Sequence, residues 1–218
     1  MKANKKSQKN VKSTAHSNQS SKEEILSAAI ELFARRGYAE TTIQDIVKKA
    51  KINLSMVSYY FGGKEALFIA CLNRSAEQGI QDIERVLLPP RSKEEFIIRL
   101  NLFVDDFFSS HIKKKYETTL IRREFTNPSK LARALVNKTI PHFFETIEGF
   151  FKSAQKIEII KKDIDTKLLT LLFLSPLLTF TGEPELVKIV SPEGIIPSSF
   201  RNLVSEKIIL MLDPFLNE

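Results

Sequence analysis

The stretch TTIQDIVKKAKINLSMVSYYFGGKEAL, residues 41–67, decides the fold. Its first part carries apolar residues at helical spacing, which give a short helix one buried face: Ile43, Ile46, Val47 and Ala50. Thr42 stands before that face with Asp45 three positions on, a pattern that resembles a capping box with Asp in place of the usual Glu or Gln. The stretch therefore opens on a short amphipathic helix.

A second short helix is predicted from Leu54 to Phe61, with Asn53 as its N-cap and Gly62-Gly63 as its stop. Val57 and Phe61 are its expected buried pair. Two short helices around a tight turn are typical of a helix-turn-helix, which sets its second helix into the DNA major groove.

The second helix carries more polar and aromatic residues than one buried face can accommodate. Its outward residues are expected to be Leu54, Ser55, Met56, Ser58, Tyr59 and Tyr60. Adjacent tyrosines cannot both point inward, because neighbours on a helix are about 100° apart. One of the two tyrosines can still pack against the first helix of the domain, and the sequence leaves that alternative open.

At this point the sequence resembles a known family. ELFARRGYAETT, then IQDIVKKA, then a helix closing on YYF, then GGKEALF, is similar to the N-terminal domain of TetR-family transcriptional regulators over residues 21–72. The matching positions keep fixed spacing: Leu32-Phe33, Gly37-Tyr38, Thr41-Thr42, Ile46, Ala50, Tyr60-Phe61, Lys64 and Leu67. One departure is Lys51, where the family usually has Gly. If the turn requires a left-handed residue, Lys costs about 1 kcal/mol there.

The resemblance implies DNA contacts from this segment. Phosphate contacts are assigned to Thr42, Asn53, Ser55, Ser58, Tyr59, Tyr60 and Lys64. Base-edge contacts are assigned to Gln44, Leu54, Ser55, Met56 and Tyr59, since Met and Leu can meet thymine methyls and Gln can pair with adenine.

The charge distribution agrees with a polyanionic partner. The chain has 218 residues and a net charge of +7. Residues 1–20 hold five lysines and no acid, whereas residues 65–218 are balanced. We expect 1–20 to be a disordered basic tail, which either lies along phosphates or only aids solubility. The single Cys71 indicates a reducing compartment, the cytoplasm, and is read as a core residue rather than a redox sensor.

The remainder predicts an all-α fold: a three-helix helix-turn-helix domain over 21–66 and a helical ligand-binding and dimerisation bundle over 67–218. A connecting helix is expected over 64–87. The later helices are expected over 92–110, 116–125, 127–157 with a kink at Pro141, 163–180, and 199–216 after a loop over 182–198. There is no apolar run long enough for a signal peptide or a membrane span.

The bundle is rich in phenylalanine, which favours either an ordinary core or a ligand site between helices. The candidate aromatic lining is Phe103, Phe107, Tyr116, Phe125, Phe143 and Phe144. Arg122, Arg123, Glu124 and His142 either orient a ligand or form internal ion pairs.

The last two helices predict a homodimer. Residues 168–178 are apolar nearly all round and need cover on several sides, which a partner subunit or a larger intramolecular bundle supplies. No catalytic, metal-binding or cofactor-binding pattern is found. The sequence therefore predicts a homodimeric repressor that binds a palindromic operator and is released by a small, largely apolar effector. The alternatives are a helical enzyme with a cryptic site and an adaptor dimer.

Overall fold

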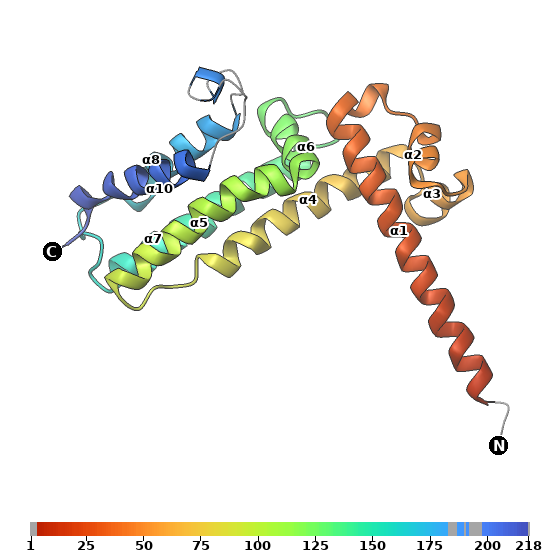
Figure 1. Cartoon of the computed structure of the whole chain (residues 1–218), viewed down its shortest axis with the longest axis horizontal. Coiled ribbons are helices and arrows are strands. Elements are labelled where there is room, and N and C mark those ends of the chain that lie inside the picture. The colour runs from red at the N-terminus through yellow and green to blue at the C-terminus, as the bar shows by residue number, and fades with distance from the viewer. Residues whose placement is uncertain (1–3, 183–186, 190, 192–197, 218) are drawn as a thin grey trace.

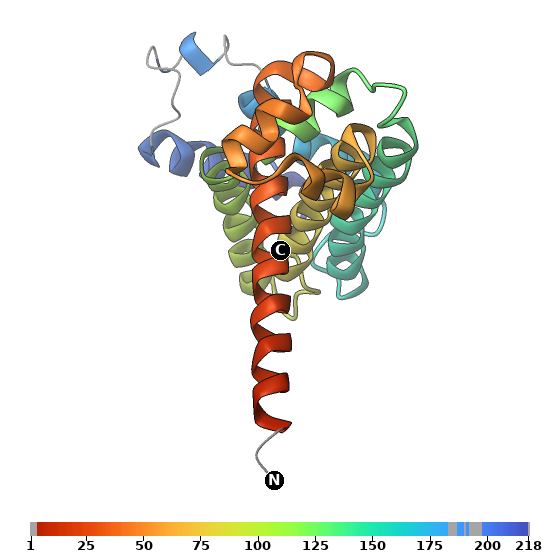
Figure 2. The same cartoon turned by 90° about the vertical axis from the view of Figure 1, so that its right-hand side faces the viewer.

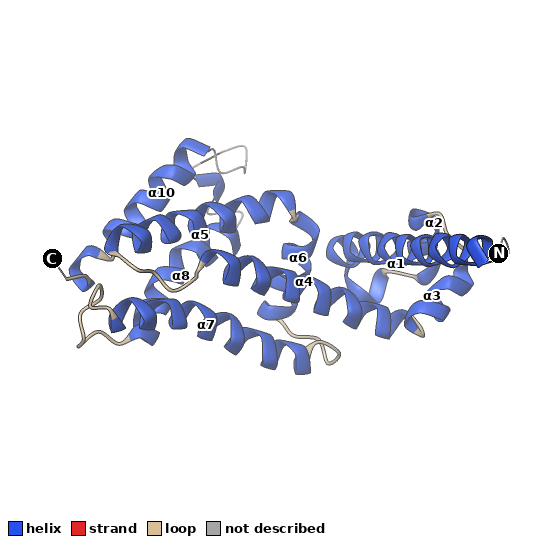
Figure 3. Cartoon of the chain, turned by 90° about the horizontal axis from the view of Figure 1, so that it is seen from below, coloured by secondary structure: helices blue, strands red, loops and turns tan. Residues whose placement is uncertain are grey.

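The computed structural model describes residues 4–182, 187–189, 191 and 198–217, and the described part of the chain is built from helices (Figure 3). The bounds are α1 (Asn4–Glu40), α2 (Ile43–Ala50), α3 (Leu54–Phe61), α4 (Lys64–Val86), α5 (Lys93–Lys113), α6 (Lys115–Thr126), α7 (Arg133–Lys156), α8 (Thr166–Gly182) and α10 (Ser198–Leu210). The all-α prediction is confirmed. The head, α1–α3, lies at one end of the molecule, and α4 runs from it along the bundle (Figure 1).

The two ends of the molecule have separate hydrophobic cores. The head core surrounds Phe33, Ile46, Val57 and Phe68, and it also takes in Leu120 of α6 with Ala132 and Val136 next to and within α7. The bundle core is built from α4, α5, α7, α8 and α10 around stacked and edge-on phenylalanines: Phe96, Phe103, Phe150, Phe151 and Phe173. The head is therefore anchored on the bundle through α4, α6 and α7.

The capping box at the start of α2 is present. The Thr42 hydroxyl accepts the Asp45 N–H at 3.1 Å, while Asp45 Oδ2 accepts the Thr42 N–H at 3.2 Å. The Thr42 hydroxyl, which also donates to the Asp45 carboxylate, holds the pKa of that carboxyl below its usual range. This reciprocal cap fixes where the helix-turn-helix begins.

The turn between α2 and α3 is left-handed at Lys51, with φ 56° and ψ 42°. That is the conformation in which Gly is favoured, so the expected strain of a non-glycine residue is present. Asn53 occupies the N-cap of α3, although its side chain makes no capping hydrogen bond, and Gly62 ends α3 at φ 80°.

The structure describes residues 4–20 of the basic tail as helix, and the expected disorder of 1–20 in the free chain stays a prediction. The structure continues α1 back to Asn4, so that one helix runs out of the body of the molecule (Figures 1 and 2). Residues 4–20 contain no Pro or Gly. A helix already nucleated by the head core adds further turns without a new nucleation cost. Gly37, at φ 85°, breaks the regular helix near its other end.

Most helix boundaries lie close to the predicted ones, and two do not. The helix expected from 127 begins at Arg133, because Ser129 forms a preceding turn in which its carbonyl accepts the Ala132 and Arg133 N–H groups. Pro141 lies inside that helix as expected. The last helix ends at Leu210 rather than Leu216, followed by a 3-10 turn over Asp213–Phe215 that contains Pro214. The loop expected over 182–198 lies largely outside the described residues.

A short pairing closes the far end of the bundle. Ile160, just after α7, bridges antiparallel to Leu216, and Asn217 donates its N–H to the Ile159 carbonyl at 2.9 Å. None of the described helices combines the length and apolar composition that a bilayer span requires.

Candidate nucleic-acid interface and ligand cavity

The outer face of α3 is open to solvent. Tyr59 is 78% exposed and Leu54 is 52% exposed, whereas Val57 on the opposite face is fully buried. Asn53, Ser55 and Ser58 are exposed as well. The face therefore presents two hydroxyls of serine, one of tyrosine, an amide and an apolar tip, which are groups that meet phosphate oxygens and base edges.

Two residues expected on that face are only partly on it. Met56 and Tyr60 are half-buried and pack against the head core. The Tyr60 ring meets the Tyr59 ring edge-on, with centroids 5.0 Å apart. The alternative left open for the tyrosines is thus realised in part: Tyr59 projects outward, and Tyr60 lies between surface and core.

Helix α2 and the start of α4 flank this face. Gln44 is exposed on α2, while the Thr42 hydroxyl is engaged in the capping box. Lys64 places its Nζ 4.3 Å from the centre of the Tyr38 ring and donates to the Ala39 carbonyl at 3.4 Å. Lys64 is therefore held at the head surface by its own domain.

The head also has bases that were not assigned to DNA from the sequence. Lys49 pairs with Glu31 at 2.9 Å, and Arg36 lies 3.7 Å from Asp45. Lys51 is exposed at the left-handed turn, directly before α3. Its basic character is a sequence signal that favours a further phosphate contact.

A cavity of about 670 Å³ lies between α4, α5, α6 and α7. Four of the predicted lining residues border it: Phe103, Phe107, Phe125 and Phe143. A volume of this size with mostly apolar walls is ordinary for a small-molecule site. The cavity opens beside the hinge between α5 and α6.

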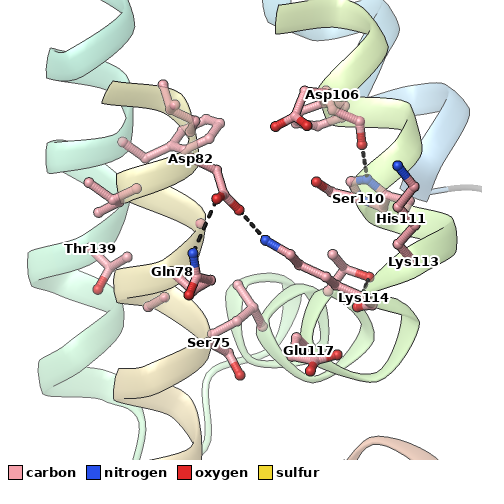
Figure 4. Close-up of a pocket in the computed structure, with 18 of the residues that line it drawn as sticks. Ser75, Gln78, Asp82, Asp106, Ser110, His111, Lys113, Lys114, Glu117 and Thr139 are labelled. Carbon is pink, nitrogen blue, oxygen red and sulfur yellow. Dashed lines mark hydrogen bonds and ion pairs between the residues drawn. The ribbon is translucent and has the colours of Figure 1, made fainter. Parts of the chain in front are cut away.

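Polar groups border the same space (Figure 4). Lys114, at the hinge, forms an ion pair with Asp82 of α4, and Asp82 also accepts from Gln78 at 3.1 Å. The His111 ring contacts the Phe107 ring at 4.8 Å, and its Nδ1 lies 2.8 Å from the Phe107 carbonyl. Burial is the main cause that lowers the pKa of His111; the hydrogen bond with Phe107 opposes it, and the charge of Arg122 adds to it.

The remaining predicted ligand residues do not reach this cavity. Tyr116 accepts a hydrogen bond from Arg35 of α1, and Arg122 donates to the Gly182 carbonyl. His142 lies 3.7 Å from Glu84 at a neighbouring hollow of about 310 Å³ between α4 and α7. Glu124 is buried and accepts the Ser129 N–H at 2.9 Å. Of Arg122, Glu124 and His142, only His142 lies within ion-pair distance of a carboxylate in the described part of the chain, whereas Arg122 and Glu124 make hydrogen bonds to the backbone instead of the expected ion pairs.

The polar lining from α4 was missed because that helix was read only as a connector. Its apolar residues contribute to both cores, whereas Ser75, Gln78 and Asp82 follow no sequence pattern that indicates a ligand site. Lys114 stands between the end of α5 at Lys113 and the start of α6 at Lys115.

Among the described residues, exposed apolar side chains gather on α8 and α10, the helices drawn on the side of the bundle away from α4 in Figure 1. The exposed residues are Leu168, Leu171, Leu172 and Leu178 of α8, Leu203 and Leu210 of α10, and Met211. The buried side of α8 packs through Leu169, Phe173 and Leu174. We call this surface the α8–α10 apolar face.

Residues 25–71 match the model of the family described as bacterial regulatory proteins, tetR family. The probable HTH-type transcriptional regulator YttP of Bacillus subtilis is 28% identical over 120 residues, which are 54% of this chain and 56% of that protein. The chain thus matches about half the length of this curated relative.

Solved structures share the fold over most of the chain. The SmeT–triclosan complex superposes with a TM-score of 0.68 at 16% identity and covers 91% of this chain and 92% of that one. SmeT is described as the repressor of a Stenotrophomonas maltophilia multidrug efflux pump. FadR of Bacillus subtilis in complex with stearoyl-CoA gives a TM-score of 0.65 at 17% identity, covering 87% of this chain and 96% of that one.

Proposed function

We propose that this chain, whose N-terminal domain belongs to the TetR family of bacterial regulatory proteins, is a ligand-responsive transcriptional repressor. It binds a palindromic operator as a homodimer. A small, largely apolar effector in the cavity between α4 and α7 releases it.

The observation that carries the proposal is the open outer face of α3. Tyr59 is 78% exposed on a helix whose other side is anchored by fully buried Val57. A large aromatic side chain held in solvent on a rigid helix serves recognition rather than packing. Within this proposal Thr42, Asn53, Ser58, Tyr60 and Lys64 meet phosphates. Gln44, Leu54, Met56, Ser55 and Tyr59 are nearest the bases, with Met56 reaching less far because it is half-buried.

A homodimer follows from the α8–α10 apolar face. The exposed leucines of α8 and α10 support this proposal, because a two-fold axis buries the same apolar residues of both subunits. In such a homodimer the two DNA-binding heads reach successive major grooves, about 34 Å apart. One eight-residue recognition helix alone reads too few bases to specify a site.

Helix α6 connects the cavity to the head. Thr118, Ile121 and Phe125 border the cavity, and Tyr116, Leu120 and Arg123 lie against the head. Arg35 of α1 donates to the Tyr116 hydroxyl and lies over its ring at 5.1 Å. An effector that moves α6 therefore moves the support of the head.

Release requires that the effector bind one head spacing better than the other. In the effector-bound state the two heads no longer fit successive grooves, so the effector lowers the affinity for the operator. By linkage, the operator lowers the affinity for the effector by the same factor. Within this proposal the protein is a repressor, because the chain without effector already exposes the outer face of α3 that binds DNA.

Selection of bound sequences from a random duplex pool tests the proposal. The expected product is a symmetric motif with two equal halves centred about one helical turn apart. Enrichment of a single unsymmetric half-site would contradict the homodimer, and the absence of any enrichment over a scrambled pool would contradict sequence-specific binding altogether.

A further inference from the structure

Two carboxylates beside the cavity have no partner within the described part of the chain. Asp106 of α5 and Glu117 of α6 border the cavity, and both are half-buried (Figure 4). Neither makes a hydrogen bond or ion pair with another described residue. Ionised carboxylates only accept hydrogen bonds, so each of these two residues can be partnered only by a hydrogen-bond donor or a positive charge.

The cations that border the cavity are engaged elsewhere or lie in solvent. Arg74 pairs with Glu23 of α1, and Lys114 pairs with Asp82. Arg85 has a side chain that is 71% exposed and lies 3.8 Å from Asp82. Lys113 is exposed. The positive charges are therefore matched or hydrated, whereas the two half-buried carboxylates have no charged partner among the described residues.

A buried hydroxyl also lacks a partner. Ser75 of α4 borders the cavity, is only 7% exposed, and its Oγ has no hydrogen-bond partner among the described atoms. Buried polar groups in folded proteins are nearly always satisfied. An orphaned hydroxyl on the wall of a cavity therefore marks a place where a bound molecule supplies the missing hydrogen bond.

The apolar walls suit a positive charge as well as an apolar body. Phe103 and Phe107 of α5, Phe125 of α6 and Phe143 of α7 border the space. Aromatic faces attract cations through their quadrupoles, most strongly where water is partly excluded. Burial lowers the pKa of His111, which keeps that ring from adding a competing positive charge.

We propose that the cavity takes an organic cation, whose charge is met by Asp106 and Glu117 and whose apolar body lies against the phenylalanine walls. This inference rests on the proposed function, because it names the chemical class of the effector. The preference runs against the net charge of the chain, which is +7, and so it cannot arise from long-range attraction to the protein as a whole.

Tetraphenylphosphonium and tetraphenylborate test the charge preference, because they share one shape and carry opposite charges. Isothermal titration of the full chain with each ion compares their dissociation constants. We expect the phosphonium to bind at least about tenfold more tightly, because two carboxylates without a charged partner border the cavity. Equal affinities, or tighter binding of the borate, would overturn the proposal.

Isosteric variants locate the charge. Asp106→Asn and Glu117→Gln should each weaken phosphonium binding about five- to tenfold and leave borate binding unchanged or improved. Asp105→Asn is the matched control, since Asp105 is the exposed neighbour that does not border the cavity. Thermal unfolding of each variant confirms that it is folded. Unchanged phosphonium affinity in both cavity variants would overturn the assignment.

DNA release separates this inference from the proposed function. If stearoyl-CoA or triclosan releases the operator while the phosphonium neither binds nor releases it, the cation class is wrong and ligand control stands. If the phosphonium binds through Asp106 and Glu117 without changing operator affinity, the chemistry of the cavity is supported and ligand control fails.

Discussion

The guanidinium of Arg123 lies against the backbone of Gly37, so closely that a Cβ built on Gly37 would stand 2.9 Å from Arg123 Nη1. Arg123 belongs to α6, and Gly37 is the break near the end of α1. The contact joins the wall of the cavity to the helix that supports the recognition domain. Gly37 also has φ 85°, a region that side chains rarely adopt.

Gly37→Ala should lower the free energy of unfolding by about 1–2 kcal/mol, chiefly through its positive φ. The guanidinium is the end of a flexible, exposed side chain, so it should move aside at small cost. Urea unfolding of the single variants and of Gly37→Ala with Arg123→Ala measures this. We expect the two changes to add within about 0.5 kcal/mol. A large recovery of stability in the double variant would show that the steric contact dominates.

Lys51→Gly should raise the free energy of unfolding by about 1 kcal/mol, because Lys51 holds the left-handed turn at φ 56°. Lys48→Gly is the matched control, because Lys48 is an exposed lysine inside α2. This substitution should lower the free energy of unfolding by about 1 kcal/mol. Chemical denaturation of both variants gives the comparison. Destabilisation by Lys51→Gly would mean that its side chain makes a stabilising contact larger than the strain.

Tyr59→Ala should weaken operator binding about tenfold or more while leaving the free energy of unfolding nearly unchanged, because the ring is 78% exposed. Tyr60→Ala should lower both quantities, since Tyr60 packs in part against the head core. Fluorescence anisotropy at one fixed salt concentration, paired with denaturant unfolding, resolves the two effects. Full operator affinity in Tyr59→Ala would remove Tyr59 from the interface.

The fold was predictable because it depends on local patterns. The helical spacing of apolar residues, Thr42 with Asp45, and Gly62 each act within a few residues, so they are visible in the sequence. The end of the last helix was misjudged because apolar spacing continues past Leu210 to Leu216, although Pro214 stands in between.

The cavity was only half predictable for a different reason. Its aromatic residues share one composition signal, and four of them converge as expected. Ser75, Asp106 and Glu117 come from α4, α5 and α6, and they are distinguished from other polar residues only by having no partner among the described residues. Asp106 and Asp105 are adjacent and chemically alike, yet only Asp106 borders the cavity. That difference depends on helix rotation in the folded bundle, which no single segment specifies.

Acid should destabilise the protein through His111. Burial lowers the pKa of His111 in the folded state, so between that value and the unfolded value of about 6.5 the unfolded chain binds more protons. The associated stability is fully present above about pH 6.5 and is lost as the pH falls through the lowered folded pKa. Unfolding free energies from pH 7.5 downward should fall less steeply for His111→Gln than for the unchanged chain. Identical slopes would show that His111 titrates alike in both states.

The central claim is that two copies of the open α3 face, joined through the α8–α10 apolar face, read one symmetric DNA site. Sedimentation velocity with a selected palindromic duplex tests it most directly, with Leu171→Glu and Leu178→Glu combined as the variant that charges the joining face. The account predicts two protomers per duplex for the unchanged chain. The variant should be a folded monomer whose affinity for the palindrome falls to that for a scrambled duplex. A monomeric variant that keeps full specific affinity, or an unchanged chain that binds as one protomer, would contradict it.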